Sequence, residues 1–238
     1  MKTKFLTWLY SLLILGILIL FTNSCKKEDN GEPEDLTGTV SDIDGNIYHT
    51  VTIGTQVWMV ENLKVTHYRN GDAIPNVTNG ITWGDLTTGA YCDYDNTSGN
   101  SAIYGRLYNF YAVADSRNIS PTGWHVPSNP EYQILIDYLG GSTVAGGKMK
   151  ESGTTHWLEP NTDASNQSGF TGLPGGFRYR GGEDNYSWIG SYGYWWSSSE
   201  ADATGAWHRY LRYNSEEINL YDYCYHKAYG FSVRCIKD

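Results

Sequence analysis

The stretch GWHVPSNPEYQILIDYLGG (residues 123–141) carries signals for both the start and the end of a helix. Ser128 and Glu131 have the spacing of a capping box, in which each side chain accepts a hydrogen bond from the other residue's backbone N–H. Pro130 suits the first turn, because a backbone N–H at that position has no partner within the helix. We therefore predict a helix that begins after Ser128 and ends at the glycine pair 140–141.

His125 stands directly before this helix and has two plausible roles. It is either a catalytic base at the start of the helix or a scaffold residue that ties the turn to neighbouring backbone. The chain has six histidines, and no two of them are spaced as i and i+4. No second catalytic group is indicated beside His125, so we expect a scaffold role.

Helical spacing recurs over residues 105–114, where Leu107, Phe110, Tyr111 and Ala114 lie on one face. A second helix is therefore predicted there. Residues 143–182 contain three glycine pairs and are predicted to be a long loop region.

Short strands separated by turn residues account for most of the remaining chain. The predicted strands cover residues 38–43, 47–53, 56–60, 193–198, 206–213, 217–223 and 230–236. Asp44-Gly45 and Gly54-Thr55 are expected to form tight hairpin turns. This order of elements predicts an α+β fold, with antiparallel strands, two helices and long loop regions.

Residues 1–24 have the layout of a secretory signal peptide, because Lys2 and Lys4 precede an apolar run over residues 5–21. The run is near the lower length limit for crossing a bilayer, so an uncleaved anchor is the alternative. The sequence TNSC (residues 22–25), which ends at Cys25, resembles a bacterial lipobox. This resemblance implies that Cys25 carries a lipid, palmitate included, and anchors the protein to the membrane.

A polar segment over residues 25–36 follows and is expected to be a flexible tether. Its lysines followed by acidic residues resemble the surface-export signal of lipoproteins in one group of Gram-negative bacteria. We therefore expect an outer-membrane lipoprotein that faces the cell exterior. Residues 37–238 are long enough for a single domain with one sizeable core.

The charge balance argues against nucleic acid as a partner. The chain has 17 basic and 26 acidic side chains, which gives a formal net charge of −9. A nucleic-acid-binding protein needs a basic surface to replace the counterions of the phosphates.

Seven blocks of sequence carry a family resemblance. They are VTIGTQVWMVENLK (51–64), YGRLYNFYAV (104–113), GWHVPSNPEY (123–132), AGGKMKESGTTHW (145–157), GFTGLPGGFRYR (169–180), GYWWSSSE (193–200) and YGFSVRCIKD (229–238). In this order they resemble the Fibrobacter succinogenes major paralogous domain family. The HVPSNPEY and GFSVR blocks are also distantly similar to the formylglycine-generating enzymes, whose kinship implies a C-type-lectin-like architecture. A shared fold implies no shared reaction.

Enzymatic signatures are missing from the sequence. There is no nucleophile elbow, zinc-protease motif or phosphate-binding loop. Cys224 and Cys235 are the cysteines that an enzyme distantly related to the formylglycine-generating family would need, but they match no motif of that family. If Cys25 is lipidated, these two and Cys92 allow at most one disulfide, whose pairing stays open.

Calcium is the one cofactor that the sequence leaves open. Asp93 and Asp95 lie in DYDNTSGN, which begins like a calcium loop. The glycine is one position late, however, and Tyr104 stands where a bidentate glutamate is needed. We therefore predict no metal site and interpret these residues as polar turn residues that satisfy their own backbone.

Aromatic residues are unusually frequent, with nine tryptophans and twenty tyrosines. Trp58, Trp124, Trp195 and Trp196 are expected in the core. Trp83 and a set of residues in or beside loops are expected to present their side chains to a ligand; that set is Trp157, Trp188, Tyr179, Tyr186, Trp207, Arg178 and Arg180. Carbohydrate is the first ligand class expected. A surface lipoprotein that interacts with proteins is the alternative, and an enzyme is the second.

Overall fold

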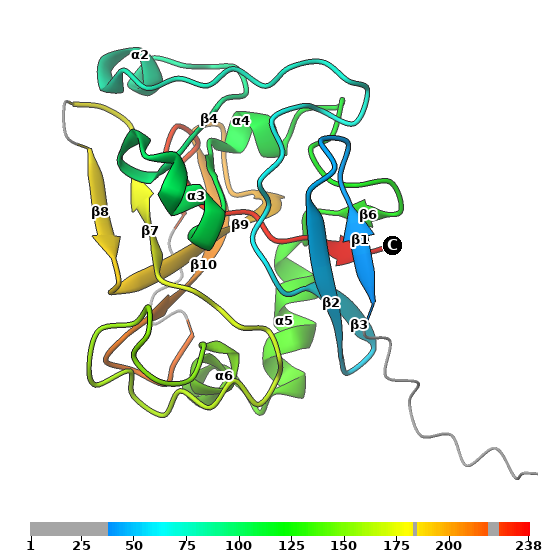
Figure 1. The fold of residues 1–238 in the computed structure, drawn as a ribbon, viewed down its shortest axis with the longest axis vertical. Helices are drawn as coiled ribbons and strands as arrows, with labels where there is room; N and C mark the ends of the chain where they lie inside the picture. The colour runs from blue at the N-terminus through cyan, green and yellow to red at the C-terminus, as the bar shows by residue number, and fades with distance from the viewer. Residues whose placement is uncertain (1–37, 183–184, 219–223) are drawn as a thin grey trace, which may run out of the picture. The chain divides into compact units, whose positions relative to one another are not determined.

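Antiparallel sheets form most of the structure, a computed structural model that describes residues 38–182, 185–218 and 224–238 (Figure 1). Within these residues, one five-stranded sheet has the order β1 (Thr39–Ser41), β2 (Ile47–Ile53), β3 (Gln56–Met59), β12 (Ile236–Lys237), β6 (Trp124–His125). A second has the order β11 (Tyr225–His226), β10 (Gly205–Arg212), β9 (Tyr192–Glu200), β7 (Gly175–Arg178), β8 (Tyr186–Ile189). Strands β4 (Tyr91–Cys92) and β5 (Leu107–Tyr108) form a separate pair. Only β7 and β9 pair in parallel among these strands.

A few short helices accompany the sheets. Those described are α2 (Gly80–Gly84), α3 (Ser98–Tyr104), α4 (Phe110–Val113), α5 (Asn129–Tyr138) and α6 (Ser142–Met149), with a 3-10 turn η1 (Tyr94–Asn96). No helix in the described ranges has the length and apolarity that a membrane crossing requires. The predicted combination of antiparallel strands and helices is confirmed, although the expected number of helices was too small.

The capping box at the start of α5 forms as predicted. The Glu131 carboxylate accepts from the backbone N–H of Ser128 at 2.7 Å, and the Ser128 hydroxyl accepts from the backbone N–H of Glu131 at 3.4 Å. Gly140 and Gly141 have φ of +101° and +95°, so the chain leaves the helix through a conformation that glycine adopts without strain.

Helix α5 packs against both large sheets, and Figure 1 shows it between them. Its buried side chains share one cluster with residues of both sheets: Tyr132, Leu135, Ile136 and Leu139 pack with Ile53 and Trp58 of the first sheet and with Trp195 and Leu211 of the second. Because burial of one large apolar side chain contributes about 1.5–3 kcal/mol, this cluster is a main source of cohesion between the sheets.

The helix predicted over residues 105–114 is wrong for its first half, and only α4 (Phe110–Val113) is helical. Gly105 has a φ of +77°, and Leu107 and Tyr108 pair with β4 as a strand. Asn109 then caps the single turn of α4, since its side chain accepts from the backbone N–H groups of Ala112 and Ala90, both at 3.0 Å. Pairing with a distant strand therefore overrides the helical spacing of the apolar residues.

The predicted loop region over residues 143–182 was too broad, because it includes most of α6 and all of β7. Lys150, at the end of α6, is fully buried and donates from Nζ to the carbonyls of Thr162, Arg212 and Ser215 at 2.8, 3.2 and 2.9 Å. Burial lowers the pKa of Lys150 to about 8. One lysine thus holds the loop to the end of β10.

The predicted strands at the two ends of the domain have different outcomes. The hairpins β1–β2 and β2–β3 are confirmed, and Gly45 and Gly54 have φ of +81° and +62° in their turns. In the predicted strand 217–223, residues 219–223 lie outside the described residues, and 217–218 are not in a strand. Residues 230–232 make isolated bridges, and of the last predicted strand only Ile236 belongs to a sheet, as the first residue of β12.

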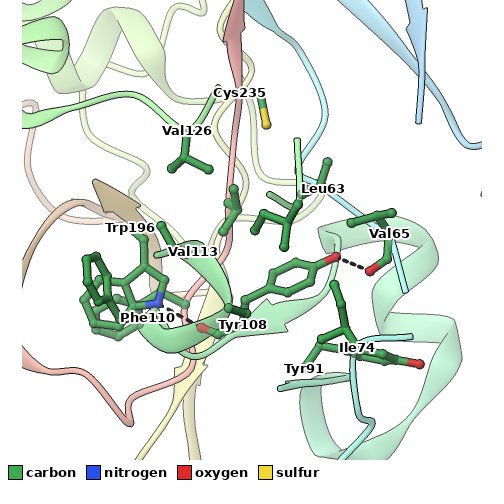
Figure 2. Close-up of a cluster of buried hydrophobic side chains, with 14 of the residues drawn as sticks. Leu63, Val65, Ile74, Tyr91, Tyr108, Phe110, Val113, Val126, Trp196 and Cys235 are labelled. Atoms are coloured by element: carbon green, nitrogen blue, oxygen red, sulfur yellow. Dashed lines mark hydrogen bonds between the residues drawn. The ribbon is translucent and has the colours of Figure 1, made fainter. Parts of the chain in front are cut away.

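A second cluster of buried side chains surrounds Tyr108 (Figure 2). The Tyr108 hydroxyl donates to the Val65 carbonyl at 2.7 Å, and Trp196 Nε1 donates to the Tyr108 carbonyl at 2.8 Å. Both polar groups therefore keep a hydrogen bond although they are buried, which avoids a large desolvation penalty.

Arg234 and Asn62 join the C-terminal part of the described chain to the segment after β3. The Arg234 guanidinium is fully buried and donates to Asn62 Oδ1 from Nε at 3.1 Å and from Nη2 at 2.7 Å. Its Nη1 donates to the Phe170 carbonyl, and Trp195 Nε1 donates to the same Asn62 oxygen at 2.8 Å. Burial lowers the pKa of Arg234 to about 9. The sequence blocks 51–64 and 229–238, which contain Asn62 and Arg234, therefore meet in the core.

Candidate functional site

A groove lined almost entirely by aromatic rings lies on the second sheet. We call it the aromatic groove and define it by the residues Phe177, Tyr179, Trp188, Tyr192, Tyr194, Tyr210, Arg212, Tyr225 and Tyr229. Its volume is about 310 Å³. A hollow of this size fits a small ligand or one segment of a longer one.

Alternation along β9 and β10 builds the middle of the groove. Tyr192 and Tyr194 are two residues apart in β9 and point to the same face, and their rings are nearly parallel at 17° with centroids 5.7 Å apart. Across the strand pair, Tyr210 lies opposite Tyr194, and Arg212 lies opposite Tyr192. Trp195, the residue after Tyr194, points to the other face and packs in the cluster around α5.

Two exposed rings stand beside the buried part of the groove. Trp188 is 48% exposed and contacts the Tyr192 ring edge-on at 4.8 Å. Tyr179 is 38% exposed and contacts the Phe177 ring edge-on at 4.6 Å. Phe177, Tyr194 and Tyr210 are buried below them. The groove therefore combines a packed floor with rings whose faces water reaches.

An unusual backbone conformation sets the direction of Trp188. Arg178 pairs with Tyr186 across β7 and β8, and both side chains pack on the side of Trp83 and Tyr94, away from the groove. In a regular strand Trp188 would point to the same side as Tyr186, because side chains alternate. Trp188 has a φ of +72° and lines the groove instead.

His208 lies in the packed floor and carries no charge at neutral pH. Its ring packs beside those of Tyr194 and Tyr210, with centroid distances of 6.0 and 5.9 Å. Burial, with a smaller contribution from the neighbouring Arg209 charge, lowers the pKa of His208 to about 3. This histidine therefore contributes shape to the floor.

Comparison with known protein families finds a match that covers nearly all of the described domain. A profile of the Fibrobacter succinogenes major domain family matches residues 51–237, which include every strand and helix described here except β1 and the start of β2. The chain belongs to this family. Neither characterised proteins nor solved structures gave a match. The predicted membership is thus confirmed, and the distant kinship with formylglycine-generating enzymes stays a prediction.

Two of the predicted ligand residues, Tyr179 and Trp188, meet in the aromatic groove of the family domain. Trp157 does not, and the expectation that its ring faces solvent is wrong. The ring is buried in the cluster around α5, and Nε1 donates to the Gly172 carbonyl at 2.9 Å. Trp157 follows a glycine-rich segment, and the sequence does not indicate that the loop folds back over this ring.

Arg178 is a packing residue in the family domain. Its fully buried guanidinium lies 4.5 Å from the Trp83 ring and donates to the carbonyls of Val77 and Thr78 at 2.6 and 2.7 Å. Trp83 is buried as well, so the expectation that it faces a ligand is wrong. Tyr186 is half-buried beside Arg178, at 5.0 Å from the guanidinium.

The remaining two predicted ligand residues also lie outside the groove lining. Arg180 is exposed beyond the end of β7, and Trp207 is half-buried at the irregular register of β10. Trp58, Trp124, Trp195 and Trp196 are all buried, as predicted for the core.

His125 is held between two carboxylates in the family domain. Its Nδ1 lies 2.7 Å from Asp238 Oδ1, and its Nε2 lies 2.8 Å from Glu131 Oε1. Burial alone would lower the pKa of His125, but these two hydrogen bonds and charges outweigh it and raise the pKa above 6.5. The contacts tie β6 to both α5 and the residue after β12, which supports the scaffold role.

The calcium candidates are engaged elsewhere. Asp93 accepts from Arg106 Nη1 at 2.8 Å and from the Ser101 hydroxyl. Asp95 has a φ of +55° and is exposed in the turn η1. Within the described ranges, no three histidine, cysteine or acidic side chains gather in a way that could hold a metal ion.

All three cysteines after residue 37 are free thiols. Cys92 and Cys235 are buried, and burial raises the pKa of Cys235 to about 12, which keeps this thiol protonated at neutral pH. Cys224 is half-buried, with Sγ 3.9 Å from Asp202 Oδ2. The structure therefore contains none of the disulfides that the sequence allowed among these residues.

Sequence reasoning missed most of the groove. The groove residues that were not among the predicted ligand residues are Phe177, Tyr192, Tyr194, Tyr210, Arg212, Tyr225 and Tyr229. A signal existed for part of this set, because Tyr192 and Tyr194 alternate in β9, as Tyr210 and Arg212 do in β10. Which face of the sheet stays open could not be inferred without the fold.

Proposed function

We propose that this chain is a lipid-anchored binding protein of the cell surface, and that its aromatic groove binds carbohydrate. The observation that carries the proposal is that two exposed rings, Trp188 and Tyr179, line one groove beside a floor of buried aromatics. A sugar ring has an apolar face of C–H groups and an edge of hydroxyls. Aromatic faces suit the first, and tyrosine hydroxyls suit the second.

The packing of the groove also favours binding without rearrangement. Trp188 rests against Tyr192, and Tyr179 rests against Phe177 and against the Tyr229 ring at 5.8 Å. Rings held by their neighbours lose little conformational freedom when a ligand arrives. A positive φ in a bulky residue such as Trp188 is a strained conformation of the kind often found at binding sites.

A C-type-lectin-like architecture is part of this proposal. Its support is the resemblance of the HVPSNPEY and GFSVR blocks to proteins of that architecture, together with the antiparallel sheets and few helices. The fold by itself assigns no ligand, so the groove remains the basis of the functional proposal.

The cellular location rests on the start of the sequence. Residues 1–24 are proposed to be a signal peptide, Cys25 the lipidated residue and residues 25–36 the tether. These residues lie outside the described part of the chain. Replacement of Cys25 with serine is expected to abolish labelling by a palmitate analogue in cells and to release the protein from the membrane fraction.

A glycan array tests the proposed activity with the full-length protein in detergent. We expect selective binding of at least one glycan class, and at least a tenfold loss of affinity in Trp188→Ala and Tyr179→Ala. Tyr138→Ala is the matched control, because Tyr138 is 65% exposed on α5 and does not line the groove. Absence of glycan binding, or equal affinity of all three variants, would contradict the proposal.

A further inference from the structure

Arg212 brings a positive charge to the end of the aromatic groove where Trp188 lies. It is the last residue of β10 and lies opposite Tyr192, whose ring contacts the ring of Trp188. Its side chain is 27% exposed. A ligand ring that stacks on Trp188 would therefore place its substituents near the guanidinium.

The backbone that carries Arg212 is fixed from two sides. The Arg212 carbonyl accepts from Lys150 Nζ at 3.2 Å, and the next residue, Tyr213, donates its backbone N–H to the Ser191 carbonyl at 2.9 Å. Lys150 is itself fully buried. The position of the guanidinium therefore depends on a rigid end of the sheet.

Within the described residues the guanidinium has one ion-pair partner, and that contact is long. The nearest carboxylate oxygen, Glu217 Oε2, lies 3.7 Å from Nη2, which is too far for a direct hydrogen bond. Nε has no acceptor in the described part of the chain. Every other described lining residue is aromatic, so the described lining contains a cation and no carboxylate.

From this arrangement we infer that the aromatic groove selects glycans that carry an anionic substituent, a carboxylate or a sulfate, and that Arg212 determines this specificity. The inference rests on the proposed carbohydrate-binding function of the groove. The planar guanidinium presents two parallel N–H donors, which match the two oxygens of a carboxylate or sulfate. Neighbouring aromatic rings lower the local polarity and strengthen this interaction.

The acidic character of the whole chain does not oppose this selectivity strongly. Its formal net charge of −9 is spread over 238 residues. Exposed charges farther than about 8 Å are largely screened at physiological ionic strength. The electrostatic interaction of a bound ligand with the nearby Arg212 charge is therefore expected to outweigh that with the distant acidic residues.

The test compares ligands that differ only in charge. The probes for the full-length protein are oligogalacturonate and its methyl ester, and a sulfated β-glucan oligosaccharide and its unsulfated form, measured by isothermal titration calorimetry. We expect the charged member of at least one pair to bind about 10- to 100-fold tighter, as one charge-assisted hydrogen-bonded pair allows. The pair that shows the preference identifies the anion.

Variants assign the preference to Arg212. Arg212→Gln is expected to reduce the preference to less than threefold while uncharged glycans still bind, which also shows that the groove is folded. Arg212→Lys is expected to retain an intermediate preference, because it keeps the charge and loses the planar pair of donors. Lys237→Gln, at an exposed position in the first sheet, removes the same charge and is expected to match the wild type.

The possible outcomes separate this inference from the proposed function. Equal affinity for both members of each pair overturns the anionic preference and leaves carbohydrate binding in place. A preference that survives in Arg212→Gln overturns the role of Arg212. Failure of every glycan to bind the wild-type protein overturns the proposed function and this inference together.

Discussion

Gly176 lies opposite Trp188 in the β7–β8 pair, and both residues have a positive φ. The register follows from the neighbouring pairs, Gly175 with Ile189 and Phe177 with Ser187. The φ angles are +63° at Gly176 and +72° at Trp188. Two residues that face each other thus depart together from the regular strand conformation, and one of them is the most exposed ring of the aromatic groove.

Gly176→Ala tests the importance of this local distortion. An added Cβ would lie 2.5 Å from the Ser187 carbonyl oxygen and 2.7 Å from the Ile189 nitrogen, in addition to the strain of a positive φ. We expect a loss of about 2–4 kcal/mol in the free energy of unfolding, measured by urea denaturation. Gly71→Ala is the control, because Gly71 has a φ of +93° and open space around its Cβ position. An equal loss in both variants would show that contacts at Gly176 do not matter.

The contacts of His125 predict a pH-dependent contribution to stability. The raised pKa of His125 means that its contribution is complete below about pH 6.5 and is lost as the pH rises through the folded-state value. The pKa of Glu131 is lowered from 4.5: burial alone would raise it, but bonds to Ser128 and His125 outweigh burial, so its contribution is lost as the pH falls through the folded-state value.

His125→Gln is therefore expected to be most destabilising between about pH 4.5 and 6.5, by about 0.5–1 kcal/mol because the site is partly exposed. Urea denaturation at a series of pH values measures the difference. Ligand binding by the aromatic groove is expected to stay unchanged. A difference from the wild type that is flat from pH 4 to 9, or a loss of binding without a loss of stability, would argue against the scaffold role.

Asn62 is expected to be among the most sensitive polar positions. Its Oδ1 accepts from Arg234 and from Trp195 Nε1, and its Nδ2 donates to the Tyr104 carbonyl at 2.7 Å. Asn62→Ala leaves the Nε and Nη2 groups of buried Arg234 and the indole N–H of Trp195 without their acceptor, so we expect a loss of about 2–4 kcal/mol. Asn70→Ala, at an exposed site, is expected to change stability by less than about 0.5 kcal/mol. Similar values for the two variants would refute the central role of Asn62.

Thiol accessibility gives an independent check of the packing. In a Cys25→Ser variant, alkylation of the native protein followed by mass spectrometry is expected to label Cys224 first. Cys92 and Cys235 are buried, and burial raises the pKa of both thiols, so they are expected to react only after unfolding. Labelling of all three at one rate in the native protein would contradict this packing.

Local signals in the sequence were reliable where the structure depends on neighbours along the chain. The capping box at Ser128 and Glu131 and the glycine pair after α5 each act within one helical turn, and both were predicted. Leu107 and Tyr108 also had helical spacing, but their partner β4 is distant in sequence. A spacing pattern cannot show that a distant strand competes for the same backbone groups.

The groove illustrates a second reason for the limits of prediction. Tyr179 and Trp188 were among the predicted ligand residues, whereas the alternating Tyr192 and Tyr194 of β9 were not. The direction of Trp188 depends on a paired backbone distortion with Gly176, and the burial of Trp157 depends on how a long loop returns to the core. Neither relationship leaves a periodic trace in the sequence.

The first sheet can be completed only late in folding, because it needs strand β12. Ile236 pairs with Trp58 on one side and with His125 on the other, so among the described strands β12 alone joins β3 to β6. A ribosome delivers residues 56–59 and 124–125 long before residues 236–237. Contacts between such distant segments form slowly, because a large loop must close first. A chain interrupted before β12 would keep its hairpins but could not complete this sheet, so a premature stop is expected to yield a protease-sensitive product.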